Sequence, residues 1–533
     1  MVYNILQTTL RGWGPCAFLA TALLFTFSFP LHQVPEFAYC FVVPFLVWGY
    51  NCSNKKVLCW SAFTAGWLGW LLTIFYLRHV WFGLPFVAAA YGGLYLGGWL
   101  FVAALVVKNA VKKSTLLRLV ILLGLSGFWV VLEWIRGWLF SGYPWLPLAA
   151  SQWERPVLLQ ILEWTGASGL SFVLIFFNLT ISTFIIELCQ SLKLRNNGLA
   201  PRPLSKYWLE GYLSMIFLIF GVFIFLKNLP QKENQQFVFN VGIVQPDIAP
   251  NLKWDQDFFW DNLRVLREES LKLKPFNPDV IIWPESAIPS PLNEDINMCL
   301  WTEGLVNEVN VPFLIGALAK EQDNKWYNAI VEVIPEHGLS PVYCAKRKPV
   351  PFGEYVPLRE WLPFLNKVVP LDFDLTPGLN KDPLKVTIND KQWKIGGLVC
   401  YEDIFSWLAR ESVLRGAQFL LVVTNDAWYH AEGGAYQHAA NSVIRAVEVR
   451  RPVIRCGNNG WSGWIDEYGN IRYVVINDLN SIYFRGGNVF PIYRDTSWNG
   501  KFTFYTQHGD WFVILSGFLI AFAALAMWKK DVA

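Results

Sequence analysis

The stretch GGLVCYEDIF, residues 396–405, ends an apolar run in a cysteine that tyrosine, glutamate and aspartate follow at once. Apolar runs of four to eight residues bounded by turn signals are typical of buried strands. Cys400 could simply fill a core, because free cysteine is among the most buried residue types. The alternative is a nucleophile at a strand-to-helix turn. A helix beginning near Glu402 would then place about half a positive charge near the thiol and lower its pKa.

Short β-rich runs alternate with helical stretches from about residue 237 to residue 485. This alternation predicts an α/β layered domain, in which reactive groups lie at the carboxyl ends of strands. Polar clusters follow such runs at Glu285 in WPES, at Lys346 in KRKPVPFGE, and at Cys400. A carboxylate, an ammonium and a thiol from separate segments predict a nucleophilic site. The carboxylate would be the general base, and the ammonium would stabilise an oxyanion.

The composition indicates a membrane protein. Of the 533 residues, 54% are hydrophobic and only 16% are charged, and 28 are tryptophan. The formal net charge of +3 is too small to favour a nucleic-acid partner. Eight apolar stretches approach the roughly 20 residues that a membrane-spanning helix needs. They are residues 17–30, 37–50, 57–77, 84–107, 116–140, 162–186, 208–226 and 511–528.

These stretches predict three regions: a membrane bundle of seven spans (1–228), a large inserted domain (229–508), and a returning eighth span with a tail (509–533). Lys and Arg collect after every even-numbered span, at 55–56, 108–113, 193–206 and 529–530. The positive-inside rule then predicts that both termini are cytoplasmic and that the large domain lies on the other side, the periplasm in a bacterium. No small-residue cleavage site follows the first span, so we expect it to be retained.

The nine cysteines show no CxxC or other metal-ligand spacing. We expect Cys299, Cys344 and Cys456 to be packing residues, although Cys344 lies only two residues from Lys346 and rivals Cys400 as the reactive thiol.

Two histidines of the inserted domain raise a metal-site alternative. His430 and His438 flank Glu432 in a Gly-rich loop. Zinc needs three or four ligands of suitable geometry, so this evidence is weak, and we expect neither a metal nor a cofactor. A Cys–His pair of Cys400 with His438 is the other use for these side chains.

Two charged residues lie within the fifth predicted span. Glu133 and Arg136 are one helical turn apart, and charges at membrane depth cost a few kcal/mol each. An i, i+3 pair partly neutralises itself, which favours a structural role in the bundle or at the interface beside Trp134 and Trp138. The alternative is a contact with lipid headgroups.

The segment 356–378 is a predicted loop that carries Trp361, Phe364 and Phe373. Long loops without secondary structure are usually functional, so this one either dips into the membrane surface, covers the site, or packs on the domain.

Several motifs together resemble a known family. WPES, KRKPVPFGE and GGLVCYED, in that order, resemble the Glu–Lys–Cys motifs of the nitrilase superfamily. VQPDIAPNLKWD, TNDAW, RAVEVRRPVIR and EWIRGWLFSGYPW resemble one membrane-embedded branch, the apolipoprotein N-acyltransferases, and the resemblance covers nearly the whole chain. It implies an αββα sandwich beside the membrane bundle. After TNDAW the family commonly has phenylalanine and glycine, whereas this chain has Tyr429 and His430, which puts the shape of the acyl pocket in question.

The resemblance also implies roles for individual residues. Glu285 would be the base, Lys346 the oxyanion stabiliser and Cys400 the nucleophile. The family's eight-residue step back from Glu354 selects Lys346 over Lys348, which strand alternation alone leaves open. Residues implied to support the site are Glu354, Tyr401, Glu402 and Trp254.

The implied reaction moves an acyl chain from a membrane phospholipid, through a cysteine thioester, to the free α-amine of a lipoprotein's N-terminal diacylglyceryl-cysteine. Taking a sixteen-carbon chain out of a bilayer costs on the order of 12 kcal/mol. This cost explains why the inserted domain would be attached to a membrane bundle. Small residues in YGGLYLGGW (91–99) would suit lateral entry of that chain.

Three other functions compete with this reaction. A membrane-anchored amidase or nitrile hydrolase would use the same triad with water as acceptor. A transporter would line a path with Glu133 and Arg136, but it predicts inverted repeats that the sequence lacks. A scaffold that binds lipoproteins without catalysis would not need Cys400. Monomer is the favoured oligomeric state.

Overall fold

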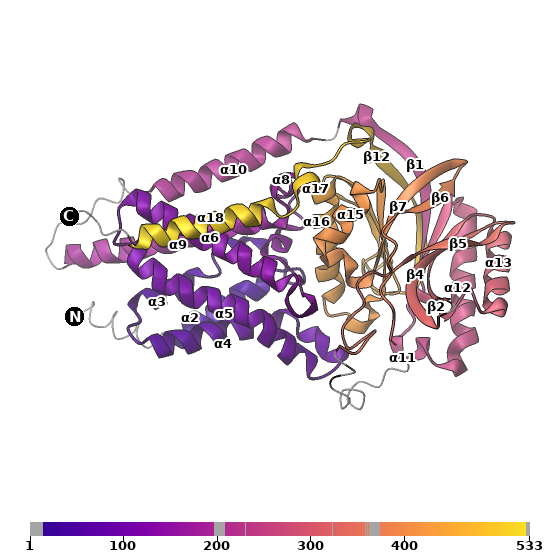
Figure 1. The fold of residues 1–533 in the computed structure, drawn as a ribbon, viewed down its shortest axis with the longest axis horizontal. Helices are drawn as coiled ribbons and strands as arrows, with labels where there is room; N and C mark the ends of the chain where they lie inside the picture. Colours follow the sequence, from indigo (N-terminus) through magenta and orange to yellow (C-terminus); the bar gives the residue numbers. More distant parts are fainter. Residues whose placement is uncertain are drawn as a thin grey trace. The chain divides into compact units, whose positions relative to one another are not determined.

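The computed structural model describes residues 14–196, 208–229, 231–321, 323–357, 359, 361 and 374–528. It divides into two compact units, Met1–Asn228 with Asp510–Ala533, and Leu229–Gly509 (Figure 1). Predicted features outside the described residues are Phe364 and Phe373 of the 356–378 loop and the basic residues Arg202, Lys206, Lys529 and Lys530. Trp361 of the same loop is 82% exposed.

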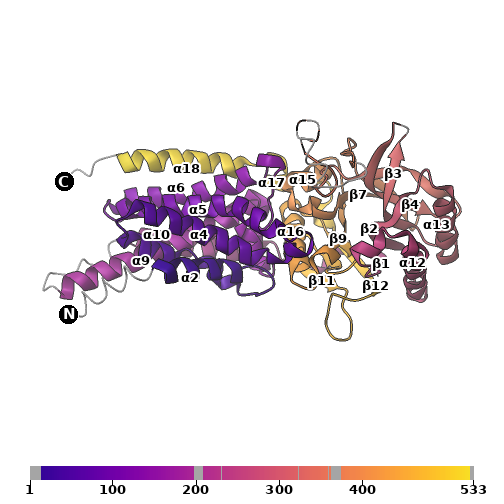
Figure 2. The ribbon, with the colours of Figure 1, turned by 90° about the horizontal axis from the view of Figure 1, so that it is seen from below.

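The first unit is a helical bundle, with its long helices side by side in both views (Figures 1 and 2). Among the described residues, five helices are long and apolar enough to cross a membrane: α5 (Leu84–Ala110), α6 (Thr115–Arg136), α9 (Ala167–Asn196), α10 (Leu209–Lys227) and α18 (Trp511–Trp528). The other helices are α2 (Gly14–Phe27), α3 (Val43–Asn51), α4 (Lys55–Thr73), α7 (Pro156–Leu159) and α8 (Leu162–Thr165). A multi-span bundle is therefore confirmed, whereas the count of eight spans is not.

The second predicted span is wrong as a single crossing helix. Residues 37–50 divide between a 3₁₀ turn, Pro35–Tyr39, and the nine-residue helix α3. Nine helical residues extend only about 14 Å, half of the roughly 30 Å hydrocarbon core. The boundaries of the predicted spans 116–140 and 162–186 also differ from those of the helices in the structure. Helix α6 ends at Arg136, and α9 begins after Gly166, whose φ of +64° breaks the chain from α8.

Glycines of the YGGLYLGGW segment bring α4 and α5 together. A Cβ at Gly66 of α4 would lie 2.6 Å from the Gly93 carbonyl oxygen, and a Cβ at Gly97 would lie 2.8 Å from the Cα of Phe63. Small residues at helix interfaces permit such close backbone approach in membranes. Gly93 and Gly97 therefore serve helix packing against α4, and lateral acyl entry along this segment stays a prediction.

The charged pair of α6 holds the irregular segment that follows this helix. The Arg136 guanidinium donates hydrogen bonds to the carbonyls of Trp145 (2.9 Å) and Leu146 (3.3 Å). The Glu133 carboxylate accepts the backbone N–H of Leu148 at 2.7 Å. Backbone groups outside helices need such partners at membrane depth, because water is absent there. The structure therefore favours the structural role of Glu133 and Arg136.

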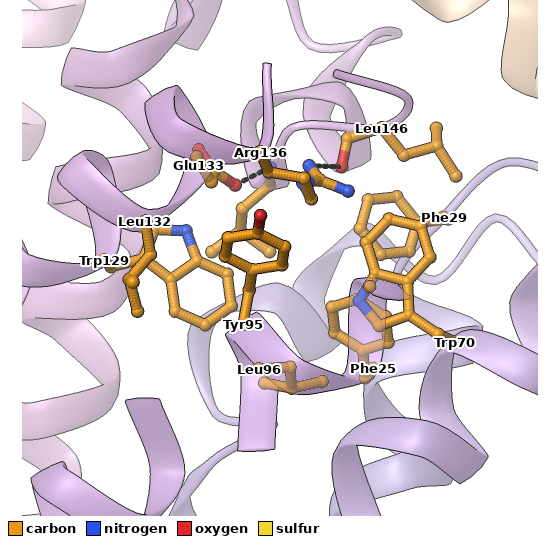
Figure 3. A pocket seen from close by; sticks show the side chains of 12 residues that line it. Phe25, Phe29, Trp70, Tyr95, Leu96, Trp129, Leu132, Glu133, Arg136 and Leu146 are labelled. Atoms are coloured by element: carbon orange, nitrogen blue, oxygen red, sulfur yellow. Dashed lines mark hydrogen bonds between the residues drawn. The ribbon is translucent and has the colours of Figure 1, made fainter. Parts of the chain in front are cut away.

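Both charged side chains also line a narrow cavity of about 20 Å³ (Figure 3), which is room for roughly one water molecule. Aromatic rings form much of its wall, and the Arg136 guanidinium lies 4.6 Å from the centroid of the Trp70 ring. The other aromatic lining residues are Phe25, Phe29, Tyr95 and Trp129.

The second unit contains two six-stranded sheets. One has the order β12-β1-β2-β3-β4-β5, and the other has the order β11-β10-β9-β8-β7-β6. Strands β1, β2 and β3 are parallel, as are β7, β8 and β9. The strands of the first sheet are β1 (Gln235–Gln245), β2 (Val280–Pro291), β3 (Phe313–Glu321), β4 (Lys325–Ile334), β5 (Gly338–Ala345) and β12 (Gly486–Asp495). Those of the second are β6 (Leu384–Ile388), β7 (Lys391–Val399), β8 (Phe419–Thr424), β9 (Val453–Gly457), β10 (Gly463–Ile465) and β11 (Ile471–Val474).

The two sheets pack face to face through one apolar core. Buried residues of both sheets, such as Ile282 and Leu421, belong to this core. A second core joins the other face of the first sheet to α12 (Phe259–Leu273) and α13 (Ile296–Val309). Helices α15 (Ser406–Leu414) and α16 (Gly434–Val449) contact the second sheet. The layers are thus helix, sheet, sheet, helix, which confirms the predicted αββα sandwich.

We predict that Arg136→Leu destabilises the protein, because two carbonyls of the buried segment lose their donors at about 1–3 kcal/mol each. The expected fall in Tm is roughly 4–8 °C, measured by thermal unfolding in detergent. Arg155→Leu is the control, because its ion pair with Glu36 is solvent-exposed and contributes little. Equal Tm values for the two variants would contradict the structural role of Arg136.

Candidate active site

Lys346 and Cys400 directly follow their strands, as predicted. The prediction that Glu285 also lies at a strand end is wrong, because β2 continues past an irregularity between Trp283 and Ile288 to Pro291. Lys346 directly follows β5, where Ala345 pairs with Ala329 of β4, and its backbone N–H donates to the Asn328 carbonyl at 2.7 Å. Cys400 directly follows β7, where Val399 pairs with Val423 of the parallel strand β8. Glu285 lies within β2, and Gly316 of β3 passes so close that a Cβ there would lie 2.7 Å from the Glu285 Cα.

One buried ammonium joins two carboxylates at the centre of this site. Lys346 Nζ lies 2.8 Å from Glu354 Oε1 and 3.3 Å from Glu285 Oε1, and the side chain is only 2% exposed. The Asn328 amide donates to the same two oxygens, at 3.0 Å and 2.8 Å. Burial alone would lower the pKa of Lys346, but the Glu354 and Glu285 carboxylates outweigh it and raise that pKa well above its ordinary value. Lys346 is therefore charged.

Cys400 occupies a strained backbone position. Its φ of +57° is in the left-handed region, which non-glycine residues rarely adopt and which is often found at functional sites. The partly buried thiol lies 3.9 Å from the Thr424 hydroxyl oxygen. Ser286, immediately after Glu285, has a φ of +45°. Strain therefore accompanies both the thiol and the carboxylate.

The expected depression of the thiol pKa is wrong. Burial, reinforced by Glu285, raises the pKa of Cys400 well above its ordinary value, although Lys346 opposes the shift. The segment after the cysteine is a short 3₁₀ turn, Cys400–Ile404, and α15 begins only at Ser406. The expected helix therefore does not begin near Glu402. At neutral pH the thiol is protonated, so a base must remove its proton as it attacks.

Glu402 joins the cysteine turn to the loop that carries Lys346. Its carboxylate accepts backbone N–H groups from Arg347 (2.6 Å), Lys348 (2.9 Å) and Val399 (2.8 Å). All of its hydrogen bonds described here go to backbone, so Glu402 acts as a scaffold residue.

Glu354 and Tyr401 hold the same loop. Glu354 Oε2 accepts the Val350 N–H at 2.7 Å, while its other oxygen faces Lys346. The Tyr401 hydroxyl donates to the Pro349 carbonyl at 2.8 Å. Glu354 and Tyr401 thus contact Lys346 and the loop that follows it, and their supporting role at the site stays a prediction.

Trp254 is 51% exposed, and the residue before it is a site residue that the sequence did not predict. Lys253 is buried, and its ammonium donates to the Glu285 main-chain carbonyl at 2.6 Å. Burial lowers the pKa of Lys253 to about 8, against the opposing effect of Glu285 and Cys400. A second basic side chain thus lies beside Glu285. The sequence offered no signal beyond its place in NLKWD, because the contact depends on how the loop after β1 folds back.

His438 belongs to neither a metal site nor a Cys–His pair. Its Nδ1 lies 2.7 Å from Asp426 Oδ1, and its Nε2 lies 2.9 Å from Asp403 Oδ1, so carboxylates engage both ring nitrogens. The alternative in which His438 activates Cys400 is therefore wrong. Within the described ranges, no group of three or more His, Cys, Asp or Glu side chains could hold a metal ion.

Arg455 completes a buried cluster with His438 behind the cysteine turn. Its guanidinium bridges Asp403 (2.8 Å) and Asp426 (3.1 Å). Asp426 also accepts the Thr424 hydroxyl at 3.0 Å, which connects the cluster toward Cys400. Burial and Arg455 would lower the pKa of His438, but the two carboxylates raise it to about 9. The imidazole is therefore a cation that donates from both nitrogens.

We predict a loss of stability at alkaline pH that depends on His438. Its folded pKa of about 9 exceeds the unfolded value of about 6.5, so its contribution is complete below pH 6.5 and is lost as pH rises through 9. The contribution is on the order of 3 kcal/mol. Thermal unfolding between pH 6 and 10 should show a decline that is absent in His438→Asn and retained in the exposed-residue control His337→Asn. The same decline in His438→Asn would contradict the assignment.

Comparison with known proteins connects both units to one family. Residues 21–180 match the model of the apolipoprotein N-acyltransferase N-terminal domain, and residues 240–478 match that of carbon-nitrogen hydrolases. The apolipoprotein N-acyltransferase of Rickettsia prowazekii is 30% identical over 83% of this chain and 82% of its own length. That of Geobacter metallireducens is 28% identical over 96% of this chain and 95% of its own.

Solved structures with some likeness include an amidase from Nesterenkonia sp. and a carbon-nitrogen hydrolase from Helicobacter pylori. Both are 15% identical to this chain, and each alignment covers 51% of it. The amidase alignment covers 95% of the amidase chain with a TM-score of 0.37, and the hydrolase alignment covers 94% of the hydrolase chain with a TM-score of 0.36. The relatives match over most of their own length, and the two family models together match both units. This chain belongs to the apolipoprotein N-acyltransferase family.

Proposed function

We propose that this acyltransferase carries its acyl group as a thioester on Cys400, from a membrane phospholipid to the free α-amine of a lipoprotein's N-terminal diacylglyceryl-cysteine. The observation that carries the proposal is the Lys346 ammonium, which is held between Glu285 and Glu354 and interacts electrostatically with the strained Cys400. The family membership supplies the class of donor and acceptor.

In the first half-reaction, Cys400 attacks the ester carbonyl of the phospholipid. Glu285 takes the thiol proton, because the raised pKa of the thiol leaves little thiolate at rest. Lys346 donates a hydrogen bond to the oxyanion of the tetrahedral intermediate. When the intermediate collapses, the carbon–oxygen bond breaks and Glu285 returns the proton to the lysophospholipid oxygen. The acyl chain remains on sulfur.

In the second half-reaction, the acceptor amine attacks the thioester. Glu285 takes the proton that the amine nitrogen releases, Lys346 again stabilises the oxyanion, and the carbon–sulfur bond breaks. Glu285 then reprotonates the thiolate. An amide replaces a thioester, which is favourable without a nucleotide or a metal. Lys253 contributes a second positive charge beside Glu285 while charge moves through this site.

The membrane unit supports the same proposal. Five helices can cross a bilayer, so a donor chain that costs on the order of 12 kcal/mol to extract can stay in the lipid phase. The distribution of Lys and Arg in the sequence supports an inner-membrane protein with both termini in the cytoplasm and a periplasmic catalytic domain. We favour a monomer.

An amidase is the second candidate, because the carbon-nitrogen hydrolase model matches residues 240–478. It would use Glu285, Lys346 and Cys400 in the same roles, with water in place of the amine. The acyl-enzyme is common to both reactions, and only the acceptor differs.

We predict that intact-mass spectrometry of the purified protein after incubation with phospholipid shows one added acyl chain, which neutral hydroxylamine removes. Cys400→Ser should lack the hydroxylamine-labile adduct. Cys344→Ser should retain it, because the Cys344 thiol packs against the Gly397 carbonyl.

Glu285→Gln should slow adduct formation by roughly 10²–10⁴-fold, as expected for loss of a general base. An adduct that persists in Cys400→Ser and disappears in Cys344→Ser would contradict the assignment of the nucleophile.

A further inference from the structure

A basic cavity lies at the end of the sandwich away from Cys400. It has a volume of about 390 Å³. Its wall is formed by the first residues of β7, by the residues just before β8 and β9, and by residues at the end of β12 and after it. Cys400 follows the other end of β7, and a nine-residue strand is roughly 25 Å long. This basic pocket is therefore separate from the candidate active site.

Four cationic residues line the basic pocket: Lys391, Lys394, Arg451 and Arg494. Among the described lining residues there is no aspartate or glutamate. Neutral hydrogen-bonding side chains complete the wall, and they are Gln236, Gln392, Gln418, Thr496 and Asn499.

Arg494 is the residue that needs an explanation. It is only 6% exposed, and its Nε has no hydrogen-bond partner among the described residues. Glu467 and Asp495 attract the guanidinium electrostatically, and its carbon lies 5.8 Å from the centroid of the Phe419 ring, but no ion pair with a carboxylate is found for it among the described residues. Asp495 is instead engaged by the Tyr468 hydroxyl and the Ser497 N–H. A buried charge without a paired partner is costly, so a guanidinium in this state favours an anion.

Arg451 adds a second buried positive charge to the basic pocket and so favours an anion further. Its guanidinium is buried and donates to the carbonyls of Ala417 (3.0 Å), Arg450 (2.8 Å) and Lys501 (3.0 Å), all of them neutral acceptors. Burial lowers the pKa of Arg451 to about 10, and the positive charge of Arg494 adds to this effect. Two buried guanidiniums thus repel each other beside two lysines.

We propose that the basic pocket binds a phosphate group. The Arg494 guanidinium, the N–H groups that Arg451 does not use on carbonyls, two ammoniums and several amides offer more donors than a carboxylate has oxygens to fill, and they suit a tetrahedral phosphate. The cavity volume leaves room for a glycerol-sized substituent.

The phosphate could be free or could belong to a lipid headgroup. Gln236 comes nine positions after Lys227, the last residue of α10, and Phe502 comes nine positions before Trp511, the first residue of α18. Residues that line the basic pocket are therefore close in sequence to the apolar helices α10 and α18. This binding is independent of the thioester chemistry at Cys400.

The test is isothermal titration of the full-length protein, in phosphate-free detergent buffer at constant ionic strength, with inorganic phosphate and with glycerophosphoglycerol, a headgroup that has no acyl chain to donate. Arg494→Met and Lys394→Gln should each weaken binding at least tenfold, while Arg264→Met on the exposed face of α12 should bind like the unmodified protein. Binding of both probes would indicate that free phosphate suffices. Binding of the glycerophosphoglycerol alone would indicate a headgroup.

A second readout separates binding from folding. Arg494→Met should have a Tm equal to or above that of the unmodified protein in phosphate-free buffer, because it removes an unpaired buried charge, and the phosphate-induced rise in Tm should disappear. If neither probe binds, or if Arg494→Met binds as tightly as the unmodified protein, the proposal is overturned.

Discussion

The Lys346 ammonium, held between Glu285 and Glu354, is the interaction on which the rest of the site depends. Two buried carboxylates within reach of the same amide, that of Asn328, would repel each other strongly without a cation between them. The ammonium fixes the end of β5 against β2 and against the loop at Glu354. We propose that its remaining donor capacity stabilises the developing oxyanion. The Lys346 side chain therefore both holds these segments together and supplies the positive charge of the site.

The same physical device recurs across both units. In the sandwich, His438 and Arg455 neutralise Asp403 and Asp426 behind the cysteine turn. In the bundle, Arg136 supplies donors to carbonyls of an irregular segment. In each case a buried cation satisfies acceptors that the backbone or a carboxylate would otherwise leave without a partner. The pair Arg451 and Arg494 differs, because Arg494 meets no acceptor at hydrogen-bonding distance among the described residues.

The sequence predicted what depends on local pattern. Strand-like runs that end in polar residues correctly located Lys346 and Cys400 directly after their strands, but not Glu285, because β2 continues to Pro291. Alternation with helices predicted the layered sandwich. It could not reveal Lys253 or Asn328, whose contacts depend on strand register and on a loop that folds back after β1. The pKa of Cys400 was predicted in the wrong direction, because a tight 3₁₀ turn replaces the expected helix and carboxylates surround the thiol. Apolar composition likewise suggested a second span, where Pro35 and Pro44 divide the segment.

The central claim is that an amine, and not water, takes the acyl group from Cys400. The most direct test uses acyl-enzyme prepared with isotopically labelled phospholipid and freed of excess donor. It is mixed either with buffer or with a diacylglyceryl-cysteine peptide whose α-amine is free, and an N-acetylated peptide is the control. The account predicts slow loss of label in buffer and with the control, and rapid transfer of label to the free amine as an amide. Release of labelled fatty acid at the same rate in all three mixtures would contradict it and identify a hydrolase.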